Sequence, residues 1–386
     1  MLKFISKGFS GPSRQKKGGS QATDSPSGSS LVAFSYKELL AATNKFHSSR
    51  VLGEGSFGKV YRGKVSGVRA EVWQEDSNEG ASKGDGSEAN ASNGDADKGD
   101  AGKAKASKPD KREVAIKVLH EDSIQGVTEW MAEILLLGRL RHPNLVNLIG
   151  YCSQKNQAML VYALMPHGGL DTWLLQDSTR PVLTWQQRIL IALGAARGLA
   201  YLHGANIIHR DLKSCNILLD ETLERHELNT LLHPHMCARL TDFGMARAGP
   251  EEGNTHVSTQ IKGTLGYLDP EYMDTGHLAP SSDMYSLGVI LLELLTGRPP
   301  VEPDSSTFLV YQIRPYFDKR EPRIDEFIDP RLEGRFGRKS AVGLAVLARH
   351  CLNDMRSKRP EADVLVERLK DLENVVMNEC VGGGTG

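Results

Sequence analysis

Long apolar runs are missing from this sequence of 386 residues. None approaches the roughly 20 apolar residues that a helix needs to span a bilayer, because glycine or a charged residue interrupts the longest candidates. The first residues lack the apolar core of a secretory signal. The second residue is Leu2 rather than the glycine that N-myristoylation requires. We therefore expect a cytoplasmic chain without a spanning helix or a myristoyl anchor.

Cysteine is scarce, and charge of one sign is not in excess. The five cysteines are odd in number and widely spaced, which favours reduced thiols over a disulfide framework: Cys152, Cys215, Cys237, Cys351 and Cys380. The formal net charge is −1, which gives no electrostatic reason to expect nucleic-acid binding. The length fits one large two-lobed domain, or two ordinary domains with tails.

Residues 1–33 form a basic segment rich in Ser and Gly, with no acid before Asp24. The main hypothesis is a disordered tail. Weak attachment to anionic lipid, which would give peripheral contact with the plasma membrane, and an organellar targeting segment are the alternatives. Residues 34–50 are expected to form a lead-in helix, because Ser35 and Glu38 have the spacing of a capping box.

A strand-rich part begins at Val51, where β-branched and aromatic residues alternate with Gly. Residues 75–111 then contain no aromatic residue and no apolar residue larger than Ala, so this stretch cannot offset its own ordering entropy. Strand-like sequence resumes at residues 113–119. We predict a disordered insertion within a folded lobe, either without a catalytic role or binding a partner.

Helical patterns dominate the second half of the chain, at residues 128–140, 185–203 and 282–297. The last should open on the capping pair Ser282-Asp283 and close at Gly297. Strands followed by helices predict an α+β fold in two lobes, with an N-lobe over residues 51–161 and a C-lobe over residues 162–375. The last residues, 376–386, are expected to be a flexible tail.

The first chemical motif is a G-x-G-x-x-G-x-V loop, with its glycines at Gly53, Gly55 and Gly58 and its valine at Val60. Glycines let the backbone approach phosphate oxygens closely. A dinucleotide-binding fingerprint would open a helix here, whereas this loop is followed by strand-like residues. The pattern predicts a phosphate-binding turn between two strands.

The second motif is Val114-Ala115-Ile116-Lys117, a lysine within an apolar strand. It could be a solubilising edge lysine or a cation that points into a cleft below the Gly-rich loop. A buried lysine needs an acidic partner. Glu133 and Glu129 lie one helical turn apart on the following helix, and we favour Glu133.

The third and fourth motifs are H-R-D-L-x-x-x-N, from His209 to Asn216, and Asp242-Phe243-Gly244. An acid and an amide five residues apart, with Lys213 between them, suit a site that gathers a hydroxyl, a phosphate and a metal ion. Together and in this order, the four motifs are the signature set of protein kinases. The chain therefore resembles a eukaryotic protein kinase over residues 46–373.

Further segments resemble plant receptor-like kinases and receptor-like cytoplasmic kinases, which are related to the interleukin-receptor-associated kinases: "RHPNLVNLIGYC", "STQIKGTLGYLDPEY" and "SDMYSLGVILLELLTG". The resemblance implies a bilobal kinase fold. It also implies an ATP-dependent serine/threonine kinase in intracellular signalling that phosphorylates protein substrates and itself. An upstream receptor kinase would be a partner. Lys213, two residues after Asp211, favours Ser or Thr over Tyr as the acceptor.

The resemblance also assigns roles to residues. Asp211 would accept or orient the hydroxyl proton, and Lys213 would offset charge on the transferred group. Asn216 and Asp242 would hold Mg²⁺, with Mn²⁺ as the alternative ion. Lys117, braced by Glu133, would grip the α- and β-phosphates. The remaining ATP site would comprise Leu52, Gly53, Glu54, Gly55, Ser56, Phe57, Gly58, Val60, Ala115, the gatekeeper Tyr162, the backbone of Ala163 and Met165, and Leu218.

Regulatory and structural roles follow from the same resemblance. Arg210 would pair with a phosphorylated activation segment, in which the candidate sites are Thr255, Ser258, Thr259 and Thr264. Thr264 could instead have a structural role beside Asp211. Other residues expected to be structural are Phe243 and Gly244 of the fourth motif, the pair Glu271 and Arg359 that would fasten the activation segment, and Asp283, which would brace the catalytic loop.

A second insertion, near residues 223–235, lengthens the chain between Asn216 and Asp242. It could be a surface bulge, a disturbance of Asp242 or an artefact of the gene model. Its histidines and the nearby Cys237 match no common zinc spacing: His226, His233 and His235. A pseudokinase scaffold that binds nucleotide or partners is the alternative function, but all the residues needed for catalysis are present, which favours an active enzyme.

Overall fold

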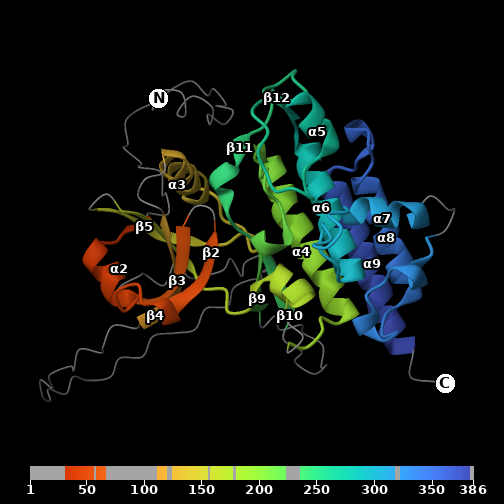
Figure 1. Ribbon diagram of the computed structural model, residues 1–386, viewed down its shortest axis with the longest axis horizontal. Coiled ribbons are helices and arrows are strands. Elements are labelled where there is room, and N and C mark those ends of the chain that lie inside the picture. Colours follow the sequence, from red (N-terminus) through yellow and green to blue (C-terminus); the bar gives the residue numbers. More distant parts are fainter. Residues whose placement is uncertain are drawn as a thin grey trace, which may run out of the picture.

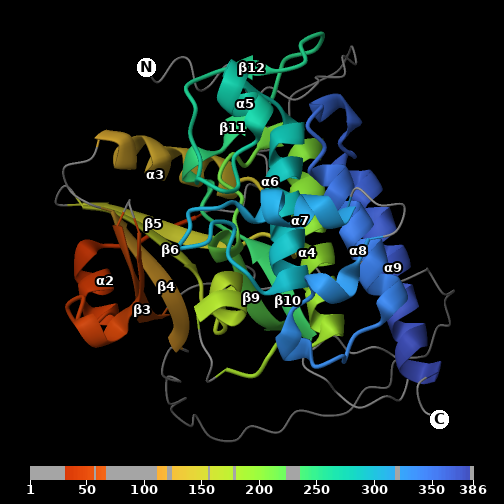
Figure 2. The same cartoon turned by 45° about the vertical axis from the view of Figure 1, so that its right-hand side comes forward.

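The computed structural model describes residues 31–55, 58–66, 111–119, 124–154, 157–176, 180–222, 235–317 and 322–382. Strands dominate one lobe and helices the other (Figure 1; Figure 2 shows the same arrangement turned). The predictions for residues 1–30, for most of the first insertion and for residues 223–234 lie outside these ranges. Within them, no helix combines the length and apolar character needed to cross a membrane.

The smaller lobe contains β1 (Val32–Ala33), α2 (Tyr36–Ala42), β2 (Val51–Gly55), β3 (Gly58–Ser66), β4 (Lys111–Leu119), α3 (Ile124–Leu137), β5 (Leu148–Gln154) and β6 (Gln157–Ala163). The larger lobe contains β7 (Gly168–Gly169), α4 (Trp185–Gly204), β8 (Ile207–Ile208), β9 (Ile217–Thr222), β10 (His235–Leu240), β11 (Arg247–Ala248), β12 (Val257–Ser258), α5 (Pro270–Thr275), β13 (His277–Leu278), α6 (Pro280–Thr296), α7 (Leu309–Phe317), α8 (Arg338–Cys351) and α9 (Ala362–Gly382).

The N-lobe sheet has the strand order β1-β5-β6-β4-β3-β2. β3 and β4 pair without a break from Gly58 opposite Leu119 to Ser66 opposite Lys111. The first insertion therefore joins the two ends of an intact hairpin. Lys111 belongs to β4, so the predicted insertion of residues 75–111 extends one residue too far.

A short N-terminal strand, β1, completes this sheet and was not predicted. It runs parallel to β5, and the Phe34 N–H donates to the Tyr151 carbonyl at 2.8 Å. A Cβ on Gly150 would collide with the Val32 carbonyl oxygen, so the approach of β1 requires glycine there. The predicted tail over residues 1–33 was wrong for residues 31–33.

The predicted capping box at the start of α2 is confirmed. The Glu38 N–H donates to Ser35 Oγ, and the Ser35 N–H donates to Glu38 Oε2 at 2.7 Å. The lead-in helix is shorter than the predicted residues 34–50. α2 packs against β3 and β5, and its buried Leu39 belongs to the same apolar cluster as Val114 and Ile116 of β4.

The C-lobe is built around α4 and α6. α6 ends as predicted at Gly297, whose φ of 63° is the left-handed conformation that favours glycine. It begins at Pro280, two residues before the predicted cap, with the Ala279 N–H donating to Ser282 Oγ at 3.4 Å. α9 continues to Gly382 and buries Val376, so the predicted flexible tail was wrong for residues 376–382, and residues 383–386 lie outside the described ranges.

The second insertion leaves its surrounding hairpin in register. β9 and β10 pair continuously from Ile217 opposite Leu240 to Thr222 opposite His235. His235 thus belongs to β10 rather than to the insertion. At the other end of the hairpin the Thr241 N–H donates to the Asn216 carbonyl at 3.0 Å, which keeps the two predicted metal-binding residues, Asn216 and Asp242, close together.

Candidate active site

Lys117 lies on the face of β4 that is turned away from the N-lobe core. Val114 and Ile116 are fully buried on one face, and alternation along the strand places Ala115 and Lys117 on the other. Lys117 Nζ lies 2.7 Å from Glu133 Oε1 and 2.7 Å from Asp242 Oδ1. One cation thereby connects the sheet, α3 and the segment that follows β10.

The charges of this triad stabilise one another. Burial alone would lower the pKa of Lys117, but the carboxylates of Glu133 and Asp242 outweigh it and raise the pKa above its ordinary value. Burial would raise the pKa of Asp242, and Lys117 instead holds it below its ordinary value. Lys117 and Asp242 are therefore both ionised at neutral pH.

Of the two glutamates that the sequence offered to Lys117, Glu133 is the one that meets it. Glu133 is 1% exposed, and its other carboxylate oxygen accepts a hydrogen bond from the Tyr162 hydroxyl. Glu129 packs against Gly244, where an added Cβ would lie 2.9 Å from the Glu129 Cβ. Sequence reasoning missed the bond from Tyr162, because it depends on how β6 and α3 pack.

The catalytic loop brings Asp211, Lys213 and Thr264 into one cluster. Lys213 Nζ lies 2.9 Å from Asp211 Oδ2, and it donates to Thr264 Oγ1 at 2.9 Å. Thr264 Oγ1 donates to Asp211 Oδ1 at 2.7 Å. Burial would lower the pKa of Lys213, but the Asp211 charge raises it. The predicted structural position of Thr264 matches this geometry.

Asp283 on α6 holds the catalytic loop from below. Its two carboxylate oxygens accept from the backbone N–H groups of His209 and Arg210, both at 2.8 Å. Arg210 and Asp242 have φ values of 72° and 63°, a strained conformation for residues other than glycine. Phe243 is fully buried, with its ring centroid 5.1 Å from that of His209. The surrounding contacts thus fix two strained residues at the site.

The surroundings of Lys117 fit an adenine nucleotide. Val60 pairs with Lys117 across the sheet, so Val60, Ala115 and Lys117 share a face and are each only partly buried. Leu218 is partly buried on β9. Within the described ranges the Met165 N–H has no acceptor, which leaves it able to bond a ligand. Of the predicted loop residues, Leu52, Gly53, Glu54 and Gly55 are exposed on β2, and Ser56 and Phe57 are not described.

Asn216 and Asp242 fit a hard cation such as Mg²⁺. Asn216 Nδ2 donates to the Asp211 carbonyl at 2.9 Å, and among the described residues its Oδ1 accepts a hydrogen bond from the Cys215 thiol at 3.8 Å. A carboxylate and an amide oxygen are suitable ligands, and Mg²⁺ usually takes few protein ligands beside substrate phosphates. In the described part of the chain no cluster of three or more His, Cys, Asp or Glu could hold a metal, so the zinc hypothesis gains no support there.

The activation segment places one phosphorylation candidate between two arginines. Thr259 Oγ1 accepts from Arg247 Nη1 at 2.8 Å and from Arg210 Nη2 at 3.2 Å. Ser258 lies exposed on β12, and Thr255 bonds to the neighbouring His256. Arg247 was missed in the sequence, where a single arginine after the fourth motif gives no signal.

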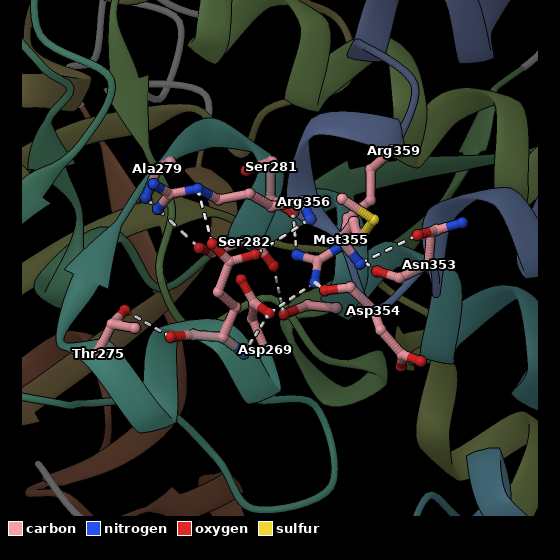
Figure 3. Close-up of polar contacts among 12 residues, drawn as sticks. Asp269, Thr275, Ala279, Ser281, Ser282, Asn353, Asp354, Met355, Arg356 and Arg359 are labelled. Carbon is pink, nitrogen blue, oxygen red and sulfur yellow. Dashed lines mark hydrogen bonds and ion pairs between the residues drawn. The ribbon is translucent and has the colours of Figure 1, made fainter.

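The predicted pair Glu271 and Arg359 does not form. Arg359 Nη2 meets Asp269 Oδ1 at 2.7 Å, and both side chains are buried (Figure 3). Glu271 instead pairs with Arg356, with Nε 3.0 Å from Oε1. Because Asp269 caps α5 and points inward, it is the acid that Arg359 reaches. The activation segment is therefore fastened by two ion pairs rather than by the predicted one.

A buried carboxyl under the catalytic loop was also missed. Glu293 on α6 is fully buried, and Ser214 Oγ and the Tyr267 hydroxyl each donate to its Oε1 at 2.9 Å. Burial raises the pKa of Glu293 to about 8. This cluster joins the loop that carries Asp211 to the segment that carries Thr264.

Comparisons with known proteins agree with this geometry. The family model described as protein tyrosine and serine/threonine kinase matches residues 84–369. The chain is similar to the probable serine/threonine-protein kinase PBL8 of Arabidopsis thaliana, with 40% identity over 89% of this chain and 72% of that protein.

Two further relatives are similar over nearly the whole chain. The serine/threonine-protein kinase PBL35 of Arabidopsis thaliana is 41% identical over 90% of this chain and 62% of its own length. A protein of Nicotiana benthamiana, named EPD1-interacting receptor-like cytoplasmic serine/threonine-protein kinase, is 39% identical over 90% of this chain and 65% of its own length. The chain thus spans less than two thirds of the length of these two relatives.

Proposed function

This chain belongs to the protein tyrosine and serine/threonine kinase family and is a serine/threonine kinase, and we propose that Asp211, Lys117 and Asp242 are the centre of its reaction. The observation that carries the proposal is the placement of Lys117 between Glu133 and Asp242. These two ion pairs hold the Lys117 cation and the Asp242 carboxylate beside the proposed nucleotide site. A phosphate chain needs such fixed charges, because positioning and neutralisation supply most of the catalysis.

Each side chain has a proposed task. Asp211 receives or orients the proton of the acceptor hydroxyl, and Thr264 fixes the rotamer of its carboxylate. Lys213, held by Asp211, offsets the negative charge of the group in transfer. Lys117 contacts the nucleotide phosphates, and Glu133 fixes its position. The N–H of Met165 bonds the adenine edge between Val60, Ala115 and Leu218.

Asn216 and Asp242 would hold Mg²⁺, which neutralises charge on the nucleotide phosphates when it is bound. Mn²⁺ prefers the same oxygen ligands and could substitute. Asp242 stays ionised for this task because Lys117 lowers its pKa.

Thr259 is the proposed site of activating phosphorylation. Arg210 and Arg247 already point at its hydroxyl, so a phosphate there would accept charge-assisted hydrogen bonds from both. Arg210 adjoins Asp211, which links the state of the segment to the catalytic loop. Thr264 is assigned a structural role instead, since its hydroxyl is used by Asp211 and Lys213.

The partners and place of action are proposed from the relatives and from the composition of the chain. One relative is named as a receptor-like cytoplasmic kinase that interacts with another protein, and this supports a cytoplasmic kinase that receives its signal from a receptor kinase. The basic residues of the first segment would add weak peripheral contact with anionic lipid. The described geometry offers no observation that favours a scaffold without catalysis.

The direct test is phosphate transfer from labelled ATP to the chain itself and to a protein substrate, with Mg²⁺ or Mn²⁺. The parent should incorporate label on Ser and Thr, and an Asp242→Asn variant should not. Transfer by the variant at the parent rate would refute the role of Asp242. Label on Tyr alone would refute the proposed acceptor.

A further inference from the structure

The outward face of α3 carries a row of exposed apolar side chains. Val127, Met131 and Leu135 are 44%, 39% and 42% exposed. They are spaced four residues apart, so they share one face of the helix. The opposite face carries the buried Glu133. Single exposed apolar residues are ordinary, but a contiguous row marks a contact surface. We call these three residues the α3 row.

The α3 row leads directly to the start of the described chain. Gly138 follows Leu135 by three residues and continues the same face. Leu31 Cδ1 lies 3.3 Å from the position that a Cβ on Gly138 would take, and Leu31 packs against the main core. Residues 1–30 therefore join the fold at the C-terminal end of the row.

The sequence before Leu31 contains a segment that matches the row. In residues 1–9, Met1, Ile5 and Phe9 have the same spacing of four as the α3 row. On a helical wheel, Lys3 and Lys7 would lie on the opposite side from these three residues. This segment could thus cover the apolar row and keep its own charges in water.

The length of the connection suits this contact. Residues 10–30 are rich in Ser and Gly, and a Ser/Gly-rich linker of that length has a root-mean-square end-to-end distance of about 25 Å. The helix between Val127 and Gly138 is about 16 Å long at 1.5 Å per residue. A tether that matches the span gives an effective concentration on the order of millimolar, so even a weak contact would be populated.

We infer that residues 1–9 of this chain dock in cis on the α3 row. Docking would favour the position of α3 in which Glu133 meets Lys117, so the segment would act as an intramolecular activator. This effect on activity rests on the proposed function, whereas the docking itself does not.

The experiment places a photoreactive benzoylphenylalanine at position 9 of the full chain, in place of Phe9. After irradiation, mass spectrometry should find adducts within one chain on residues 124–138. Met131→Gln combined with Leu135→Gln should lower the adduct yield by about tenfold, equivalent to about 1.4 kcal/mol. The matched control is Val364→Gln on α9, a residue that is 48% exposed, and it should leave the yield unchanged. Equal melting temperatures would show that the variants fold.

Other outcomes overturn the proposal. Isotope-labelled and unlabelled chains are mixed before irradiation. Adducts that join a labelled to an unlabelled chain would show that residues 1–9 dock on a second copy. If the chain sediments with phosphatidylserine vesicles and the α3 adducts are then lost, residues 1–9 bind the membrane rather than α3. Absence of α3 adducts under all conditions would refute docking. A chain that forms the adducts but transfers no phosphate would instead refute the proposed function.

Discussion

At the scale of single residues, the geometry of the site depends on the few hydrogen bonds that hold the buried carboxylate of Glu133. Glu133 is almost fully buried, and the contacts that fix it are Lys117 Nζ and the Tyr162 hydroxyl. A buried carboxylate that loses one of two partners incurs a desolvation penalty. Tyr162 therefore has a positioning role in addition to its place at the proposed nucleotide site. It positions the glutamate that positions the lysine.

Tyr162→Phe tests this role. The variant keeps the ring and removes only the hydroxyl, so the free energy of unfolding should fall by about 1–2 kcal/mol. The KM for ATP should rise, since Glu133 holds Lys117 less firmly. Denaturant unfolding and steady-state kinetics measure the two effects. Tyr316→Phe in the C-lobe is the matched control, and a parent-like KM for Tyr162→Phe would contradict the role of the hydroxyl.

Thr259→Ala tests the assignment of the activating phosphorylation. Arg210 and Arg247 would lose the phosphate that pairs with them, and activity should fall by about tenfold or more, given about 1.5–3 kcal/mol for a charged hydrogen bond. Thr255→Ala, at an exposed position on the same segment, should retain activity. The check is the initial rate on an added substrate after autophosphorylation. If Thr255→Ala is the impaired variant, the assignment is wrong.

The chemical residues could be predicted from local motifs, whereas several of their partners could not. Fixed spacing within each short motif is enough to propose Asp211 and Asn216 from one motif and Asp242 from another. Arg359 pairs with Asp269 rather than with Glu271 because the turn before α5 directs the Asp269 side chain inward. That direction is not visible in the sequence. Two acids that are two residues apart look equivalent in the sequence.

At the scale of elements, β1 attaches the N-terminal part of the chain to the sheet that carries Lys117. Gly150→Ala should displace β1, because the added Cβ would collide with the Val32 carbonyl. We expect a loss of about 1–3 kcal/mol in the free energy of unfolding. Gly204→Ala is the control, since nothing lies within 4 Å of its Cβ position. Equal melting temperatures of the two variants would contradict the role of β1.

Elements with strong local signals were predicted well. The Ser35 capping box and the stop of α6 at Gly297 follow from short-range chemistry, and the strand after the first insertion was predicted from its own residues. The strands β9 and β10 around the second insertion were not predicted. β1 gives no such signal, because two residues cannot show a period and its pairing with β5 is non-local. The start of α6 was predicted two residues too late: the helix begins at Pro280, and Asp283, which looks like a cap, braces the catalytic loop.

At the scale of the whole molecule, Glu293 joins three parts of the C-lobe. The folded chain retains the proton of this carboxyl up to a pKa of about 8, whereas the unfolded chain releases it near the ordinary value of 4.5. The folded state binds more protons between these values. The contribution of Glu293 to the free energy of unfolding is therefore fully present below pH 4.5. It is lost as the pH rises from 4.5 to about 8, at up to about 1.4 kcal/mol per pH unit.

Glu293→Gln removes this dependence, because an amide does not ionise. Relative to the parent, the variant should gain stability as the pH rises from about 5 to about 8, and the difference should then level off. Denaturant unfolding of both proteins across this range measures it. A difference that is constant with pH would show that Glu293 is ionised in the folded chain, contrary to this prediction.

The transfer rate of Asp211→Asn with labelled ATP tests most directly whether Asp211 receives the acceptor proton in an active kinase. We predict a loss of roughly 10²–10⁴-fold in kcat, the usual contribution of a general base, with unchanged affinity for ATP. Asp274→Asn, at an exposed position on α5, should retain the parent rate. Parent-like turnover by Asp211→Asn would contradict the assignment of Asp211 as the catalytic base.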